Sequence, residues 1–349
     1  MAVDPTTHDE ELARLTDAVK ADPTDADAQV RLGRSFRARH RWKDAIDALK
    51  AAIRISPDHV QARLHLAGVY RELGRLEEAI DAYKQAARID PDDANIHFCL
   101  GATYAALDRW DEAIDEFMYV IRIKPDYEKA HYCVGEAYGK LERWQEAIDA
   151  LKQGIHLKPD DAGAHYALGS AYTWVERWQD AIDAYKQAIH LKPDFAEAHN
   201  ALADTYAELN RWQDAIDAYK ACVRLNPDDP TAPFGLGTAY VSTGRWPDAI
   251  DANKEAIRRK PDFAEAHFVL GVAYTCLDRW EEAIDAYKQA IRRKPDFAEA
   301  HCGLGDAYTE LERWDDAIEA YKQAVRINPD DANALYHLAD ALERSRCAR

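Results

Sequence analysis

The chain has 349 residues, of which 47% are hydrophobic and 31% charged, and its formal net charge is −18. This composition indicates a folded protein, and the length predicts several domains or an elongated repeat. The acidic charge disfavours proteins that bind nucleic acids or anionic membranes, because both need clustered Lys and Arg. No apolar run approaches the ~18 residues of a membrane span. Without Cys-x-x-Cys pairs or a signal-peptide pattern, the sequence predicts a cytoplasmic protein with free thiols.

Prolines recur along the chain at a constant spacing of 34 residues. They are Pro23, Pro57, Pro91, Pro125, Pro159, Pro193, Pro227, Pro261, Pro295 and Pro329. Such a period is typical of stacked helical repeats. With this proline at position 32, nine full units are predicted, at 26–59, 60–93, 94–127, 128–161, 162–195, 196–229, 230–263, 264–297 and 298–331. We expect residues 1–25 to form an N-terminal half-repeat, or capping helix, and residues 332–349 a C-terminal capping helix.

Within each unit the residue pattern predicts a helix, a short turn and a second helix. The first helix carries Leu at position 7 in most units, a small residue at position 8 and an aromatic ring at position 11. This spacing places the three side chains on one helix face. Position 20, in the second helix, is Ala throughout. Small residues allow two helices to approach closely while large rings fill the remaining space, so the sequence predicts an all-α protein of repeated helix pairs.

The segment between units contains residues that end one helix and start the next. Proline at position 32 stops the second helix, and Asp follows it at position 33 in every full unit. In three units Glu lies three residues after this Asp, which predicts a capping box at the start of the next helix. The expected pairs are Asp194 with Glu197, Asp262 with Glu265 and Asp296 with Glu299.

Two further columns of residues recur with the repeat. Histidine occupies position 4 in six units: His97, His131, His165, His199, His267 and His301. Equivalent side chains in neighbouring units lie about 10 Å apart, too far to share one zinc ion, so we expect packing or groove lining. Tryptophan at position 17 begins most second helices and predicts inter-helix packing, whereas Trp174, at position 13, is the one Trp outside this column.

Unit 230–263 departs most from the pattern. It contains Pro230, Pro233 and Pro247, and Asn253 replaces the usual Tyr or Phe. These residues predict weaker packing and a soft spot in this unit rather than a break.

A 34-residue helix–turn–helix unit with Leu-Gly at positions 7–8, Tyr at 11, Ala at 20 and 27 and Pro at 32 resembles the tetratricopeptide repeat. The resemblance covers nearly the whole chain. It implies antiparallel helix pairs stacked into a right-handed superhelical solenoid, whose first helices line a concave groove that binds a ligand through positions 2, 5, 6, 9, 12 and 13. Because the chain has no phosphate-binding glycine loop, no metalloprotease motif and no nucleophile motif, we expect no enzyme, no cofactor and no metal.

The groove positions change in character along the chain. The first two units supply a basic stretch and the next three an aromatic one. Of the last four, the first and the last are acidic and the two between them each supply a phenylalanine. The predicted partner-binding residues are Arg31, Arg34, Arg37, His65, Arg71, Phe98, Tyr132, Tyr166, Trp174, Asn200, Asp204, Glu208, Phe234, Phe268, Asp306 and Glu310. They predict a segment with acidic residues at the N-terminal end, apolar or aromatic anchors in the middle and basic residues beyond.

The leading interpretation is a non-catalytic scaffold or adaptor that binds a protein or peptide in this groove. One alternative is a self-assembling structural oligomer, for which Leu335, Leu338 and Leu342 form an apolar stripe on the last helix. Another is a recruiting or regulatory subunit of an enzyme whose catalytic part is on another chain. RNA binding ranks last, because it needs a basic groove.

Overall fold

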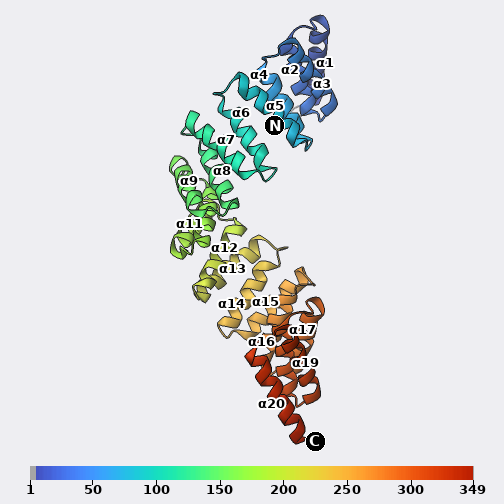
Figure 1. The fold of residues 1–349 in the computed structure, drawn as a ribbon, viewed down its shortest axis with the longest axis vertical. Coiled ribbons are helices and arrows are strands. Elements are labelled where there is room, and N and C mark those ends of the chain that lie inside the picture. Colours follow the sequence, from blue (N-terminus) through green and yellow to red (C-terminus); the bar gives the residue numbers. More distant parts are fainter. Residues whose placement is uncertain (1–4, 349) are drawn as a thin grey trace. The chain divides into compact units, whose positions relative to one another are not determined.

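The computed structural model describes residues 5–348, which form twenty α-helices and contain no strand. The chain divides into two compact units between Val175 and Glu176, called unit 1 and unit 2 below (Figure 1). The all-α repeat architecture predicted from the sequence is confirmed. The repeat predicted at 162–195 is divided, since its first helix belongs to unit 1 and its second to unit 2.

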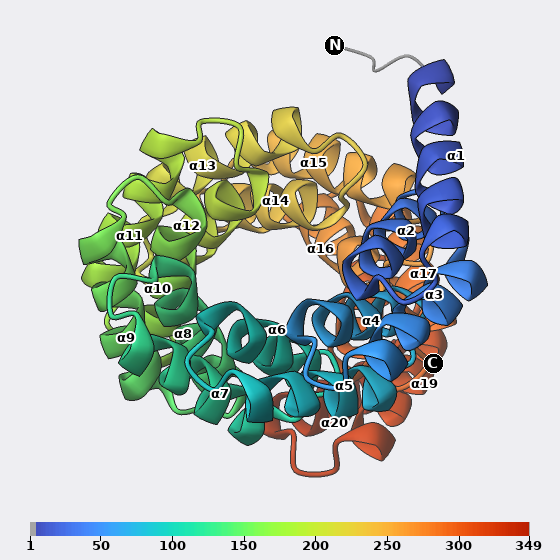
Figure 2. The same cartoon turned by 90° about the horizontal axis from the view of Figure 1, so that it is seen from above.

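Unit 1 contains ten helices: α1 (Pro5–Ala21), α2 (Ala26–Ala38), α3 (Trp42–Ile55), α4 (Val60–Glu72), α5 (Leu76–Ile89), α6 (Ala94–Ala105), α7 (Trp110–Ile123), α8 (Glu128–Lys140), α9 (Trp144–Leu157) and α10 (Ala162–Trp174). Each helix packs against the next one along the chain. First helices also contact each other, as α2 does α4 and α8 does α10. Figure 2 shows α6, α8 and α10 along one side of this unit and α7 and α9 along the other.

Unit 2 contains the other ten: α11 (Trp178–Leu191), α12 (Ala196–Glu208), α13 (Trp212–Leu225), α14 (Thr231–Ser242), α15 (Trp246–Arg259), α16 (Ala264–Thr275), α17 (Trp280–Arg293), α18 (Ala298–Glu310), α19 (Trp314–Ile327) and α20 (Ala332–Ala348). The same arrangement holds here, with α12, α14 and α16 along one side and α13 and α15 along the other (Figure 2). Within unit 2, the first helices α12, α14, α16 and α18 each contact their own second helix and a neighbouring first helix.

The turn inside each repeat has one recurring backbone geometry. The residue at position 15 adopts a left-handed conformation, with φ of 57° at Glu142 and 70° at Gly244. The next amide then donates back to the aromatic residue at position 11, as Arg143 N does to the Tyr138 carbonyl at 2.9 Å. This six-residue closure is the Schellman ending of an α-helix, and it turns the chain sharply into the second helix.

The predicted capping boxes are wrong. Apart from α14, whose N-cap is Pro230, the first helices from α2 to α18 begin one residue later than expected, so the N-cap is position 34. Its side chain caps the helix only where it is Asp or His. Asp161, for example, accepts from the amides of Gly163 and Ala164 at 3.0 and 3.1 Å. After Asp194, Asp262 and Asp296, the N-cap of the next helix is Phe195, Phe263 and Phe297, respectively. No side chain caps these three helices. A polar side chain at the N-cap reaches the free amides of the first turn, and phenylalanine offers no acceptor there.

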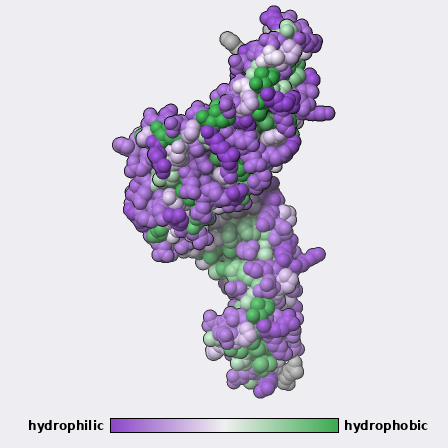
Figure 3. Space-filling view, turned by 45° about the horizontal axis from the view of Figure 1, so that its top comes forward, coloured by the Kyte–Doolittle hydropathy of each residue, from purple (hydrophilic) through white to green (hydrophobic). Residues whose placement is uncertain are grey.

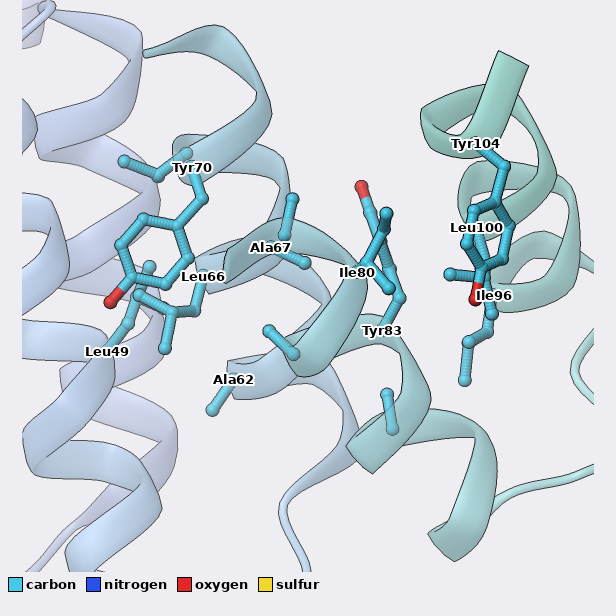
Figure 4. Close-up of a cluster of buried hydrophobic side chains, with 14 of the residues drawn as sticks. Leu49, Ala62, Leu66, Ala67, Tyr70, Ile80, Tyr83, Ile96, Leu100 and Tyr104 are labelled. Atoms are coloured by element: carbon cyan, nitrogen blue, oxygen red, sulfur yellow. The ribbon is translucent and has the colours of Figure 1, made fainter. Parts of the chain in front are cut away.

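A continuous apolar core runs between successive helices of unit 1 (Figure 4). Leu49 of α3, Tyr70 of α4, Tyr83 of α5 and Leu100 of α6 are all buried in it. Because the buried residues of this core come from all the helices from α2 to α8, burial rather than helix propensity alone stabilises these repeats.

Close approach of the two helices in a repeat depends on the small residue at position 8. A Cβ atom on Gly135 would lie 2.5 Å from Cγ of Leu151, the residue at position 24 of the same repeat. The close approach expected at the small residue is confirmed, but the residue that faces it is position 24 of the second helix and not the ring at position 11.

Candidate functional site

The predicted aromatic residues Tyr132, Tyr166 and Trp174 line one cavity in unit 1. They come from α8 and α10, and Trp144 at the start of α9 completes the aromatic wall. The cavity has a volume of about 340 Å³ and also includes Glu136. Residues 34 and 42 positions apart in the sequence (Tyr132 with Tyr166 or Trp174) meet here because consecutive first helices lie side by side.

Trp174 is the most unusual side chain of this cavity. It is 66% exposed, whereas most large apolar residues of the chain are buried. Its ring stacks on Trp144, with a centroid distance of 5.1 Å and an interplanar angle of 6°. The surface in Figure 3 is mostly hydrophilic with scattered hydrophobic patches. Trp174 is thus an exposed indole held against a half-buried one, and Trp is a residue type that often carries much of the binding energy at interfaces.

The tyrosines add hydrogen-bonding capacity to the cavity. Desolvation, helped by the negative charge of Glu136, raises the pKa of Tyr132 to about 12. Its phenol therefore stays protonated at neutral pH and can donate to a partner's carbonyl oxygen. The arrangement can hold an apolar or aromatic side chain and orient it with a polar contact.

The predicted basic residues at the start of unit 1 are only partly brought together. Arg34, Arg37 and His65 line a second cavity of about 600 Å³ between α2 and α4. Arg31 and Arg71 are exposed but do not line it, and Arg31 lies 3.6 Å from an Asp25 carboxylate oxygen.

The predicted phenylalanines pack more closely with their own repeats than a groove position implies. Each one is half-buried and contacts the aromatic residue at position 34 of its unit. The ring centroids are 5.3 Å apart for Phe98 and Tyr127, 4.8 Å for Phe234 and Phe263, and 4.9 Å for Phe268 and Phe297. These pairs cover the junction between repeats, where an uncapped helix begins.

The predicted acidic residues of unit 2 also have partners within the chain. Asp204 accepts from Tyr219 Oη at 2.5 Å and from Asn200 Nδ2 at 3.0 Å. Partial desolvation raises the pKa of Asp204, against the hydrogen bond from Tyr219. Asp306 likewise accepts from Tyr321 Oη at 2.7 Å.

Glu208 and Glu310 lie exposed at the C-terminal ends of α12 and α18. They are one helical turn beyond Asp204 and Asp306, so each helix presents a pair of carboxylates on the same face. Asp204 and Asp306 each accept a hydrogen bond from a tyrosine, whereas neither glutamate does so among the described residues.

The histidine column has a structural role that the sequence indicated only as packing. In each of the six repeats, Nε2 of this histidine lies 2.9–3.3 Å from the carbonyl oxygen of the proline at position 32 of the preceding repeat. For His165 and Pro159 the distance is 2.9 Å. A carbonyl can only accept, so Nε2 carries the hydrogen. Each histidine thereby ties the start of a first helix to the preceding loop.

Two sets of structural residues were missed. The Arg at position 16 stacks on the aromatic ring at position 11 and pairs with the acid at position 19. Arg143, for example, lies 4.6 Å from the Tyr138 centroid and 2.9 Å from Glu146. Arg259 donates to the carbonyl oxygens of Asn226 and Asp229 at 3.3 and 2.8 Å, which binds the loop before its repeat. Their fixed spacing along the repeat was the available signal.

All six cysteines carry free thiols. In residues 5–348, no three His, Cys, Asp or Glu side chains are grouped so that they could hold a metal ion. Over the same residues, every helix is too short or too polar to cross a membrane.

Family profiles match nearly the whole chain. The profile described as the cilia and flagella-associated protein 70 C-terminal domain matches residues 56–256, more than half of the chain. Tetratricopeptide repeat profiles match residues 234–296, 277–321 and 305–345. The profile of anaphase-promoting complex, cyclosome, subunit 3 matches residues 10–86. No curated protein matches the chain in sequence.

Solved structures of repeat proteins resemble the chain. The C-terminal part of a TPR repeat-containing protein from Cytophaga hutchinsonii aligns with a TM-score of 0.60 at 16% identity, over 69% of this chain and 99% of that one, and it supports the fold. MamA aligns at 30% identity over 47% of this chain and 96% of its own, with a TM-score of 0.46. YrrB, a TPR protein with an unusual peptide-binding site, has 22% identity, coverages of 54% and 97% and a TM-score of 0.49.

The profiles, the periodic residues and the stacked helix pairs agree. The chain belongs to the tetratricopeptide repeat family, and over residues 56–256 to the group described as the cilia and flagella-associated protein 70 C-terminal domain.

Proposed function

We propose that the chain is a non-catalytic scaffold that binds a protein or peptide segment, and that the cavity formed by Tyr132, Trp144, Tyr166 and Trp174 is its main anchor site. The observation that supports this most is the 66% exposure of Trp174 while it stacks on Trp144. An exposed indole held rigid by a second one loses little conformational entropy when a partner covers it. The nine predicted repeats, the predicted groove residues outside this cavity and the cytoplasmic location are part of the same proposal.

The chemistry of the anchor follows from the cavity lining. Four aromatic rings favour an apolar or aromatic side chain of the partner, and the protonated phenol of Tyr132 favours an adjacent carbonyl. Glu208 and Glu310 in unit 2 favour basic residues elsewhere in the partner.

Self-association is the second candidate, because α20 exposes apolar side chains. Leu335 is 45% and Tyr336 70% exposed, and Leu342 is also exposed. These residues lie on a helix packed on α19 and, more weakly, on α18. A second copy covering them would remove this apolar surface from water.

A single substitution tests the leading proposal. Trp174→Ala removes an exposed ring, so we expect it to leave helicity unchanged and to release the partner. Wild type and variant are used as baits in soluble extract of the native cell, and the captured proteins are identified by mass spectrometry. Binding of the purified candidate partner is then measured by quenching of tryptophan fluorescence.

Tyr336→Ala is the matched control, since it removes an equally exposed ring from α20. A protein that is retained by wild type and by Tyr336→Ala but lost with Trp174→Ala supports the aromatic cavity. Equal retention by all three baits rejects it. If wild-type chains capture each other and Tyr336→Ala abolishes this, light scattering over a concentration series will show the self-association.

A further inference from the structure

The cavity between α2 and α4 contains more basic side chains than it contains partners for them. Arg34 and Arg37 project from α2, His65 and Glu72 from α4, and Trp42 closes one side. Its volume of about 600 Å³ is large enough for a carboxylate or phosphate group with its attached chain.

Arg37 is already engaged within the cavity. Its Nη2 lies 2.5 Å from Oε1 of Glu72, and the hydrogen bond with this carboxylate raises the pKa of Arg37. The guanidinium also lies against the backbone of α4, because a Cβ on Gly68 would be only 2.9 Å from Arg37 Nη1. Arg37 and Glu72 therefore form a fixed, neutral wall.

Arg34 and His65 have no such partners. Among the described residues, neither makes an ion pair or a hydrogen bond, although His65 is half-buried. Desolvation, together with the positive charges of Arg34 and Arg37 and the neighbouring His59, lowers the pKa of His65 to about 4. The imidazole is thus neutral at pH 7, and an anion beside it would reverse the main electrostatic effect.

We propose that this cavity binds one oxyanion, a carboxylate or phosphate group on an acidic segment of the partner, between Arg34 and His65, and that His65 takes up a proton when it binds. The inference rests on the proposed function in so far as the scaffold's partner supplies the acidic segment. A protein segment fits better than a nucleic acid, because the chain's net charge of −18 repels a polyanion outside this basic end.

Proton uptake gives the binding a defined pH dependence. Arg34 and Arg37 of α2 and the neighbouring His59 act on His65, and Glu72 and His40 line the same cavity. Nε2 of His59 itself lies 3.1 Å from Asp27. If the bound anion returns the pKa of His65 from about 4 to its ordinary value of about 6.5, affinity rises about tenfold from pH 7.5 to pH 5.5. Below the free pKa both states are protonated, and the increase levels off.

The test uses the full chain and two probes at constant ionic strength. Inorganic sulfate keeps its charge over pH 5.5–7.5, and a ten-residue glutamate peptide presents carboxylates on a chain. Binding of each is measured by isothermal titration calorimetry. We expect both probes to bind wild type about tenfold more tightly at pH 5.5. Arg34→Gln should weaken both about 10- to 100-fold, the usual effect of losing a charged hydrogen bond.

His65→Gln separates proton uptake from simple charge attraction. We expect it to bind both probes with affinity that no longer changes between pH 7.5 and pH 5.5. Arg54→Gln, an exposed arginine on α3 outside the cavity, is the control and should behave as wild type.

Four results would overturn the inference: neither probe binds, Arg34→Gln binds like wild type, His65→Gln keeps the wild-type pH dependence, or sulfate binds but the peptide does not. The last outcome would indicate a free-anion site. Trp174→Ala should bind sulfate normally, so failure of the aromatic cavity and failure of this site can be told apart.

Discussion

Two neighbouring repeats of unit 2 solve the same packing problem with different residues. Helices α14 and α15 form one repeat, and α16 and α17 form the next. Position 24 of the repeat, which lies in its second helix, is Asn253 in the former and Tyr287 in the latter. Tyr287 is 2% exposed, covers Gly271 and lies with its hydroxyl 3.1 Å from Thr275 Oγ1. Its ring is therefore buried, and its hydroxyl has a hydrogen-bond partner.

Asn253 occupies the same place less well. It is completely buried, and its Nδ2 donates to the Ala249 carbonyl at 2.9 Å, but its Oδ1 has no hydrogen-bond partner. A buried acceptor without a partner costs about 1–3 kcal/mol. The comparison teaches that the residue at position 24 must fill the space beside position 8 and must also have a partner for each polar atom that it buries.

The buried asparagine of the first repeat can be introduced into the second repeat by substitution. Tyr287→Asn should destabilise the α16–α17 repeat by about 3–5 kcal/mol, because it opens a cavity and leaves a buried amide short of partners. Native-state hydrogen exchange, resolved by peptide, measures the local opening free energy of these helices. Asp285→Asn, an exposed position on the same helix, is the control. Equal protection in the two variants would contradict the role given to Tyr287.

The reverse substitution should repair the weaker repeat. Asn253→Leu keeps the side-chain size and removes the unpartnered oxygen, and Leu49 and Leu151 already pack against glycine at this position. We expect a gain of about 1–3 kcal/mol in the opening free energy of α14 and α15. The predicted soft spot at 230–263 stays a prediction, and uniform exchange protection across these repeats in the wild type would count against it.

At the turn between the two helices, the first repeat has the more favourable residue. Position 15 is Gly244 with φ of 70° in the first repeat and Asp278 with φ of 55° in the second. Left-handed backbone disfavours side chains with a Cβ, so Asp278→Gly should stabilise its repeat by about 0.5–1 kcal/mol. Gly244→Ala should destabilise the other by about 1 kcal/mol. Thermal unfolding of both variants should show shifts of opposite sign.

The smallest effect concerns pH. Desolvation and the positive charge of Arg293 lower the pKa of His267 in α16, although the hydrogen bond to the Pro261 carbonyl acts in the opposite direction. The equivalent residue of α14 is Pro233. With the folded pKa below the unfolded one, the unfolded chain binds the proton first. Stability of the α16–α17 repeat should therefore fall as pH drops below about 6.5.

His267→Gln should remove part of this slope in hydrogen exchange corrected for intrinsic rates. The α14–α15 repeat serves as the internal reference, since it has no histidine at that position. An unchanged slope in the variant would show that other groups carry the acid sensitivity.

The fold could be predicted because its signals are local and repeat. Proline at position 32, the small residue at position 8 and the ring at position 11 each specify a helix end or a helix face from neighbours within a few residues. The same periodicity placed Tyr132, Tyr166 and Trp174 on adjacent first helices, and they do line one cavity.

Other features depended on atoms that meet only after the helices stack. The N-cap of these helices is position 34 and not 33, as at Tyr127, and Phe98 pairs with this residue instead of standing free. Trp144 stacks on Trp174 and Arg37 pairs with Glu72, whereas Arg34 and His65 make no ion pair or hydrogen bond with any residue that the structure describes. The sequence by itself determined which residues form the helices and which faces are buried. The rotation between stacked helices decided these contacts, because it sets distances that no spacing along a single helix contains.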